Sequence, residues 1–159
     1  LIFYVKNKEV KKMKRWLGNI KKQLLSKSYK DVFSILFSLQ VSMFSFATGA
    51  FLIVKGDANA EGSDTYKLMD SLMNMDTWGL FFVVSAVLIL ISTFQESKAK
   101  YINMLIGGVI GVFILSLYAS ASAEGQSQWL LPVRYALSAC FNLFIAGVGG
   151  VELWKLKNK

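Results

Sequence analysis

Four long apolar segments dominate the hydropathy pattern of this sequence, and polar stretches separate them. They cover residues 32–54, 78–94, 101–121 and 133–151. A helix rises about 1.5 Å per residue and the hydrocarbon layer of a bilayer is about 30 Å thick, so about 20 apolar residues span it. Each segment is close to this length, and the second contains almost no polar side chain that could face water. The pattern predicts an all-α, polytopic integral membrane protein with four transmembrane helices packed as a bundle.

The charges around these segments predict an orientation. Ten of the 18 Lys and Arg residues lie in residues 1–30, and three lysines lie in residues 155–159. The first loop, residues 55–77, has five acidic residues and two lysines, the second is a tight turn with two lysines, and residues 122–132 contain Glu124 and no basic residue. Because Lys and Arg in short flanks mark the cytoplasmic side, we expect both termini in the cytoplasm and a plasma-membrane location.

Aromatic residues near the segment ends agree with this orientation, because Trp and Tyr prefer the depth of the lipid headgroups. We expect Tyr29, Tyr101 and Trp154 at the cytoplasmic ends, and Trp78, Trp129 and Tyr135 at the opposite ends. In the first loop, the apolar residues within 66–75 predict a short additional helix. The predicted organisation is a basic cytoplasmic segment (1–30), a transmembrane domain (31–154) and a basic tail (155–159).

The basic segment has the pattern of an amphipathic helix. Apolar residues recur at spacings of three and four, with Lys and Arg on the other faces, at Val10, Met13, Leu17, Ile20 and Leu24. Such a helix binds anionic lipid headgroups, where each basic residue contributes about 1 kcal/mol. The predicted lipid-surface contacts are Lys14, Arg15, Trp16, Lys21 and Lys22. A partner protein is an alternative ligand of the same surface, and nucleic acid is a less favoured one.

Small residues recur on one face of three apolar segments. They are Ser34, Ser38, Ser42, Ser45 and Gly49 in the first, Gly107 and Gly111 in the third, and Ser138, Asn142, Ala146 and Gly150 in the fourth. Helices in lipid associate through close backbone packing and interhelical hydrogen bonds, which small residues permit. We therefore predict that these are helix-packing residues, and we expect Gln40 and Asn142 to form hydrogen bonds across helices. The alternative is that the serines and Asn142 line a narrow polar path.

Arg134 is an ionisable residue close to the start of the fourth segment. It follows Pro132, a residue suited to a helix N-terminus. A cation at this position opposes the helix dipole, so we expect it to have an anionic partner. The sequence offers Asp76 and Glu124 for this ion pair.

The sequence lacks the chemistry that several function classes require. It has no His, one Cys, no Gly-x-Ser-x-Gly motif and no pair of acidic residues inside an apolar segment. These are the usual catalytic or metal-binding groups. We therefore expect no enzymatic activity, no metal and no cofactor.

Three functional hypotheses remain. In length and number of spans the chain resembles the small multidrug transporters, which carry a membrane-embedded glutamate in the first helix, but residues 32–54 contain none. A holin-like pore-former is small, lacks catalytic residues and assembles through helix faces, although here the dense charge is N-terminal. The favoured hypothesis is a non-catalytic accessory, anchoring or exclusion/immunity component of a membrane complex. Its partner would be another membrane protein or a second copy of this chain.

Overall fold

The computed structural model describes residues 28–60, 62–125 and 129–158, and all regular secondary structure within them is helical. The helices are α2 (Tyr29–Ala60), α3 (Asp64–Leu72), α4 (Met75–Phe94), α5 (Lys98–Gly125) and α6 (Leu130–Lys157). Four segments are long and apolar enough to cross a membrane, namely Asp31–Gly56, Met75–Phe94, Lys98–Glu124 and Leu130–Lys157. The predicted all-α fold with four membrane-spanning helices is confirmed, and α6 continues into the predicted tail.

The chain divides into two compact units within α2, Leu1–Leu36 and Phe37–Lys159. In the described part of the first unit, the Tyr29 and Phe33 rings of α2 lie 5.1 Å apart between centroids. The second unit contains residues 37–60 of α2 and all of α3 to α6. This second unit forms the helix bundle.

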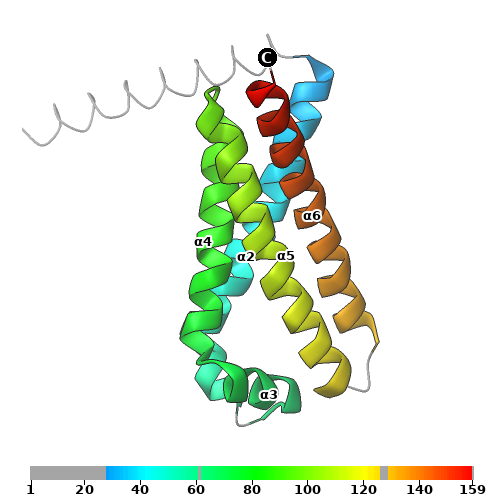
Figure 1. The fold of residues 1–159 in the computed structure, drawn as a ribbon. Coiled ribbons are helices and arrows are strands. Elements are labelled where there is room, and N and C mark those ends of the chain that lie inside the picture. Colours follow the sequence, from blue (N-terminus) through cyan, green and yellow to red (C-terminus); the bar gives the residue numbers. More distant parts are fainter. Residues whose placement is uncertain (1–27, 61, 126–128, 159) are drawn as a thin grey trace, which may run out of the picture. The chain divides into compact units, whose positions relative to one another are not determined.

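Within the second unit, α4, α5 and α6 run up and down in turn, and α3 lies across one end (Figure 1). α5 has extensive contacts with both α4 and α6, and α3 contacts α4 and α5. α2 approaches α4 closely at Gly49 and Gly79, and it contacts α6 through Phe37 and Phe141. The four long helices are therefore packed against one another, as the sequence predicts.

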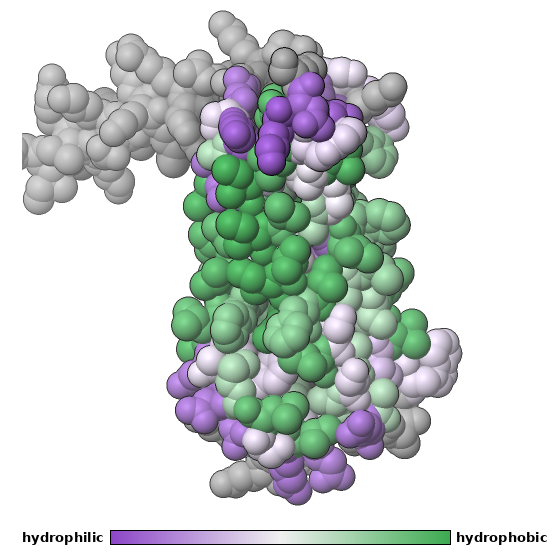
Figure 2. All heavy atoms as spheres, viewed as in Figure 1, coloured by the Kyte–Doolittle hydropathy of each residue, from purple (hydrophilic) through white to green (hydrophobic). Residues whose placement is uncertain are grey.

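The side chains exposed along the middle of the helices are mostly large and apolar. Phe113 of α5 is 65% exposed and Phe144 of α6 is 66% exposed. In Figure 2, hydrophobic residues cover the middle of the visible face, and hydrophilic residues gather toward both ends. Water would solvate so large an apolar surface poorly, whereas lipid tails solvate it well. The surface supports a bundle embedded in a membrane.

Buried apolar side chains form two clusters inside the bundle. The larger, nearer α3, contains Leu52, Met69, Met75, Trp78, Phe82, Ile114, Leu115, Tyr118, Ala121 and Ala139. The smaller contains Val41, Ile89, Met104 and Ile145. In lipid, helix association depends on close packing more than on removal of apolar surface from water. The fit between facing side chains therefore matters more here than the amount of apolar area.

Trp78 attaches α3 to the bundle. Its side chain is 1% exposed, and its indole Nε1 donates a 3.0 Å hydrogen bond to the carbonyl oxygen of Met69 in α3. The sequence predicted a headgroup position for Trp78, but the structure buries this residue within the protein because α3 packs over the first turns of α4. The short helix predicted within residues 66–75 is present as α3, which begins two residues earlier.

Candidate functional site

The predicted small-residue face of α2 is buried over most of its length. The buried members are Ser38, Ser42, Ser45 and Gly49, whereas Ser34 is exposed and belongs to the first unit. A methyl group built on Gly49 would lie 2.7 Å from the carbonyl oxygen of Gly79 in α4. The two backbones are therefore in direct contact, with no room for a side chain between them.

α5 places small residues against two helices at once. A methyl group built on Gly107 would lie 3.0 Å from Cβ of Leu88 in α4, and one on Gly108 would lie 2.8 Å from Cβ of Ala146 in α6. The Gly107-x-x-x-Gly111 motif predicted a close approach to one neighbour. In the structure, adjacent glycines contact opposite neighbours, so α5 packs closely on both sides.

On α6 the predicted face is only partly the packing face. Asn142 and Ala146 are buried, and Ser138 and Gly150 are half-buried. The backbone of α6 approaches α5 closely at Asn142 and Ala146, opposite Gly108, and also at Gly149, where a methyl group would lie 2.8 Å from the carbonyl oxygen of Tyr101 in α5. Sequence reasoning missed Gly149 because a strict four-residue period from Ser138 selects the neighbouring Gly150.

Asn142 lies where α4, α5 and α6 meet. A methyl group built on Gly111 would lie 2.6 Å from Cγ of Asn142 and 2.9 Å from Oγ of Ser85. Asn142 Nδ2 donates a 2.9 Å hydrogen bond to the carbonyl oxygen of Ser138 in its own helix, and Oδ1 has no hydrogen-bond partner among the described residues. The interhelical hydrogen bond predicted for Asn142 is therefore not formed. The facing surface of α5 is the Cα of a glycine, which offers no N–H or O–H donor.

Several hydroxyl groups in the bundle form hydrogen bonds within their own helices. Ser42, Ser92 and Thr93 donate to carbonyl oxygens three or four residues earlier at distances of 2.7–2.9 Å. Ser85 instead donates across to the carbonyl oxygen of Gly107 in α5 at 2.8 Å. Hydroxyls bound to their own backbone are small, satisfied packing groups. Buried hydroxyls without a partner in the described part of the chain are those of Ser45, Thr65 and Ser122.

Three tyrosines from three helices meet near α3, a cluster that sequence reasoning did not identify. The Tyr118 hydroxyl of α5 donates a 3.1 Å hydrogen bond to that of Tyr66 in α3. The Tyr118 ring centroid lies 4.0 Å from that of Tyr135 in α6. Phe82 and Phe44 add ring contacts at 6.1 Å each. Ring pairs such as the two at 6.1 Å contribute about 0.5–1.5 kcal/mol each beyond their buried area. Tyr66 and Tyr118 are 52 residues apart, so no local sequence pattern connects them.

The Arg134 guanidinium lies 5.0 Å from the ring centre of Phe44 in α2. The ion pair predicted with Asp76 or Glu124 is absent from the ion pairs of the described residues. Both carboxylates are exposed, and pairing exposed charges contributes only about 0–1 kcal/mol. A cation over an aromatic ring contributes a comparable 0.5–1 kcal/mol, roughly. Arg134 therefore contacts a ring where the sequence suggested a carboxylate.

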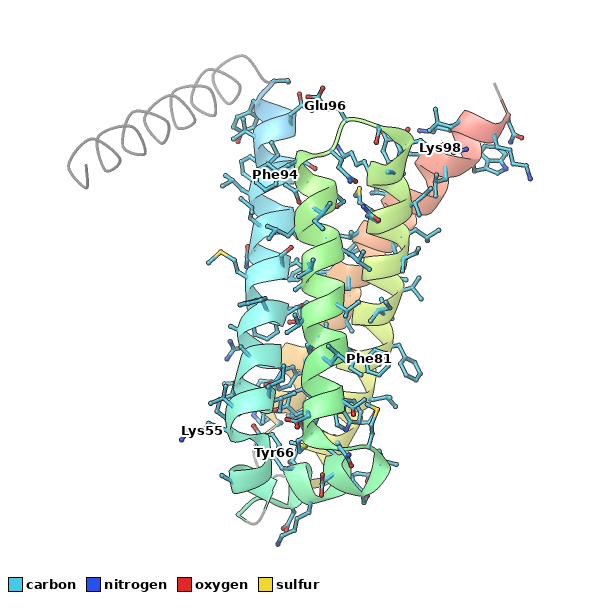
Figure 3. The ribbon with its side chains drawn as sticks, turned by 90° about the vertical axis from the view of Figure 1, so that its left-hand side faces the viewer. Lys55, Tyr66, Phe81, Phe94, Glu96 and Lys98 are labelled. Carbon is cyan, nitrogen blue, oxygen red and sulfur yellow. The ribbon has the colours of Figure 1, made fainter. Side chains whose placement is uncertain are left out.

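Charged residues of the second unit lie toward the helix ends. In Figure 3, Lys55 lies at the α3 end, Glu96 and Lys98 lie at the opposite end, and Phe81 between them points away from the bundle. Ion pairs within the described ranges include Lys67–Asp64 at 3.4 Å on α3 and Lys155–Glu152 at 2.6 Å on α6. Within those ranges, no group of three or more His, Cys, Asp or Glu side chains could hold a metal ion.

Several hollows lie between or beside the helices. One of about 330 Å³ lies between α2 and α4 and is lined by Ser42, Met43, Phe46, Ala47, Ala86, Val87 and Leu90. A cavity of about 270 Å³ lies between α2 and α6 and is lined by Gln40, Val41, Phe44, Arg134, Leu137, Ser138, Phe141 and Asn142. Gln40, which was expected to bond across helices, is exposed and lines this cavity. Another hollow, of about 300 Å³, lies on the outer side of α6 around Gly147. A methyl group on Gly147 would have no atom within 4 Å.

The predicted lipid-surface residues Lys14, Arg15, Trp16, Lys21 and Lys22 lie outside the described residues.

Comparison of the chain with protein-family models, with characterised proteins and with solved structures found no match. The function is therefore argued from the bundle itself. Its polar and small residues are arranged for close packing, and its hollows are the places where a ligand or partner could add contacts.

Proposed function

We propose that this protein is a non-catalytic, multi-pass component of the plasma membrane that binds another membrane protein, as an accessory, anchoring or exclusion/immunity subunit. The observation that supports this most is how the bundle interior is used. Its small residues bring backbones together at Gly49, Gly108 and Gly149, and Asn142 Nδ2 bonds to its own helix. The interior serves the cohesion of the bundle, which leaves the outer surface for a partner.

The proposed orientation has both termini in the cytoplasm. The α3 end carries the acidic residues Asp64, Asp70 and Asp76, and the first turn of α5, at the opposite end, carries Lys98 and Lys100. This distribution follows the preference of Lys and Arg for the cytoplasmic side. The basic residues 1–30 would then face the anionic inner leaflet, where they attract headgroups.

Two exposed serines test this orientation. Ser71 lies on α3 and Ser97 lies in the α4–α5 turn. In a Cys140→Ser background, we expect a membrane-impermeant maleimide to label Ser71→Cys in intact cells. Ser97→Cys should react only after the cells are permeabilised. Labelling in the reverse order would contradict the orientation.

The outer side of α6 is the surface that we infer for the partner. Gly147 lies in the middle of a helix, where glycine costs roughly 1 kcal/mol relative to alanine. No side chain of the described bundle uses the space that it leaves. Small residues are the usual contact points between helices in lipid, and a partner helix lying in this hollow would explain the glycine.

Affinity purification in mild detergent tests the proposed function. We expect the tagged chain to retain one stoichiometric membrane protein that an unrelated four-helix control does not retain. The Gly147→Leu variant, whose side chain fills the hollow, should no longer retain this membrane protein. Val109→Leu on the exposed face of α5 should keep it, because this matched control adds bulk elsewhere. Absence of any stoichiometric partner, or collapse of the membrane potential on induced expression, would contradict the proposal, and the collapse would favour a pore-former.

A further inference from the structure

α2 contacts its two neighbours in different ways. Toward α4 it presents Gly49, whose backbone contacts that of Gly79. Toward α6 it presents aromatic rings, with the Phe37 and Phe141 centroids 5.5 Å apart and the Phe44 and Tyr135 centroids 6.1 Å apart. Small residues bring helices together, whereas large rings hold them apart. The aromatic pairs therefore leave space between α2 and α6. α2 and α4 also enclose a hollow, of about 330 Å³, away from the Gly49–Gly79 contact, but no charged side chain lines it.

The space between these pairs is the cavity of about 270 Å³. Its α6 wall runs from Arg134 to Asn142, which is about 12 Å at a rise of about 1.5 Å per residue. Because Phe37 contacts Phe141 and Phe44 contacts Tyr135, the two helices are antiparallel. The cavity is thus a narrow slot parallel to the helices. It lies just below the range of typical small-molecule sites, about 300–1,000 Å³.

The chemistry of the slot changes along its length. At the end nearest the start of α6, Arg134 lies over Phe44, and the described residues place no carboxylate within ion-pair distance of it. Farther along, Val41, Leu137 and Phe141 supply apolar walls, and Gln40, Ser138 and Asn142 add uncharged polar groups. A positive group at one end of a mostly apolar slot complements an amphiphile that has an anionic head and a hydrocarbon tail.

We propose that the α2–α6 cavity binds an anionic phospholipid, with the upper part of one acyl chain in the slot and the phosphate at Arg134. The guanidinium presents N–H donors in a geometry that matches phosphate oxygens. The slot lies between helices that are long and apolar enough to span a membrane, where phospholipid is the surrounding solvent. This inference depends on membrane insertion and not on the proposed partner protein, so either can fail alone.

Native mass spectrometry of the full-length chain in detergent tests the site, with phosphatidylglycerol as the probe and phosphatidylcholine of the same chain length as comparison. We expect one phosphatidylglycerol to be retained preferentially. Arg134→Gln should weaken its binding about tenfold or more, as for a lost charge-assisted hydrogen bond. Lys67→Gln removes one exposed positive charge from α3 and is the matched control. It should change binding less than about twofold, because surface charges contribute little.

A second pair of variants tests the slot without changing charge. Ser138→Phe places a ring in the cavity, whereas Cys140→Phe places the same ring on an exposed side of α6 outside it. We expect the first to prevent lipid retention and the second to preserve it. If Ser138→Phe does not give a monodisperse protein, Ser138→Leu replaces it.

Four results would overturn the proposal. The first is equal retention of phosphatidylglycerol by the wild type and Arg134→Gln. The second is equal loss in Ser138→Phe and Cys140→Phe. The third is displacement of the lipid by inorganic phosphate alone, which would show that the acyl chain contributes nothing. A mass increase that corresponds to a second chain, lost on Ser138→Phe, would likewise assign the slot to a protein and not to lipid.

Discussion

Replacing Gly111 with alanine tests whether the carboxamide of Asn142 sets the spacing of three helices. The new methyl group would lie 2.6 Å from Cγ of Asn142 and 2.9 Å from Oγ of Ser85, and the Asn142 carboxamide oxygen would be closer still. All three atoms belong to buried side chains. The substitution therefore adds one carbon atom at a point where α4, α5 and α6 are already in contact.

The magnitude follows from how firmly these neighbours are held. Asn142 Nδ2 is hydrogen-bonded to Ser138, and Ser85 Oγ to Gly107. Overpacking a core costs about 1–3 kcal/mol, and contact with three held atoms places Gly111→Ala in the upper half of that range. The higher intrinsic helix propensity of alanine relative to glycine offsets about 0.8–1.0 kcal/mol of this cost. We expect a net loss of about 1–2 kcal/mol in the free energy of unfolding.

Unfolding of the purified protein by a denaturing detergent measures this loss. Gly147→Ala is the matched control, because its methyl group meets no atom within 4 Å. It should leave the stability unchanged or raise it slightly. The double variant Gly111→Ala/Asn142→Ala lacks the carboxamide that the new methyl group would contact. Its loss in the free energy of unfolding should therefore be about 1 kcal/mol smaller than the sum of the losses in the two single variants. Wild-type stability of Gly111→Ala, or simple additivity in the double variant, would refute the packing argument.

The remaining predictions concern α3 and the helix ends. Trp78→Phe removes the hydrogen bond to Met69 and should destabilise the protein by about 1–2 kcal/mol, with faster proteolysis in α3 than elsewhere; uniform proteolysis would argue against a specific α3 contact. Tyr118→Phe keeps the ring contacts but removes the hydrogen bond to Tyr66. We expect the free energy of unfolding to fall by about 0.5–1 kcal/mol in the same unfolding assay. Lys155→Ala breaks an exposed ion pair and should change stability by less than about 0.5 kcal/mol. A larger change would mean that Lys155 has a structural role beyond that pair.

Sequence periodicity predicted most of the buried small residues of α2 and α5, with Ser34 as an exposed exception, but not which helix each one contacts. Ser38, Ser42 and Ser45 lie on the predicted face and are buried. Gly107 and Gly108 are adjacent in the sequence, yet they contact α4 and α6 respectively. A four-residue period describes a face of one helix and carries no information about its neighbours.

Arg134 and Asn142 show the same limit for polar groups. Charge and burial arguments predicted an ion pair for the first and an interhelical hydrogen bond for the second. The structure places the Arg134 guanidinium over Phe44 and the Asn142 carboxamide oxygen against a glycine. The residue that each polar group contacts depends on which part of a neighbouring helix lies opposite it. The register between the two helices determines this.

The sequence by itself determined that this chain forms four long apolar helices, because helix length and hydropathy are local properties matched to the thickness of a bilayer. Only the tertiary structure decided that α3 packs over Trp78, that three tyrosines meet from three helices, and that aromatic pairs open a slot between α2 and α6. These features join residues far apart in the chain. They depend on how whole helices are placed against one another, which no local pattern encodes.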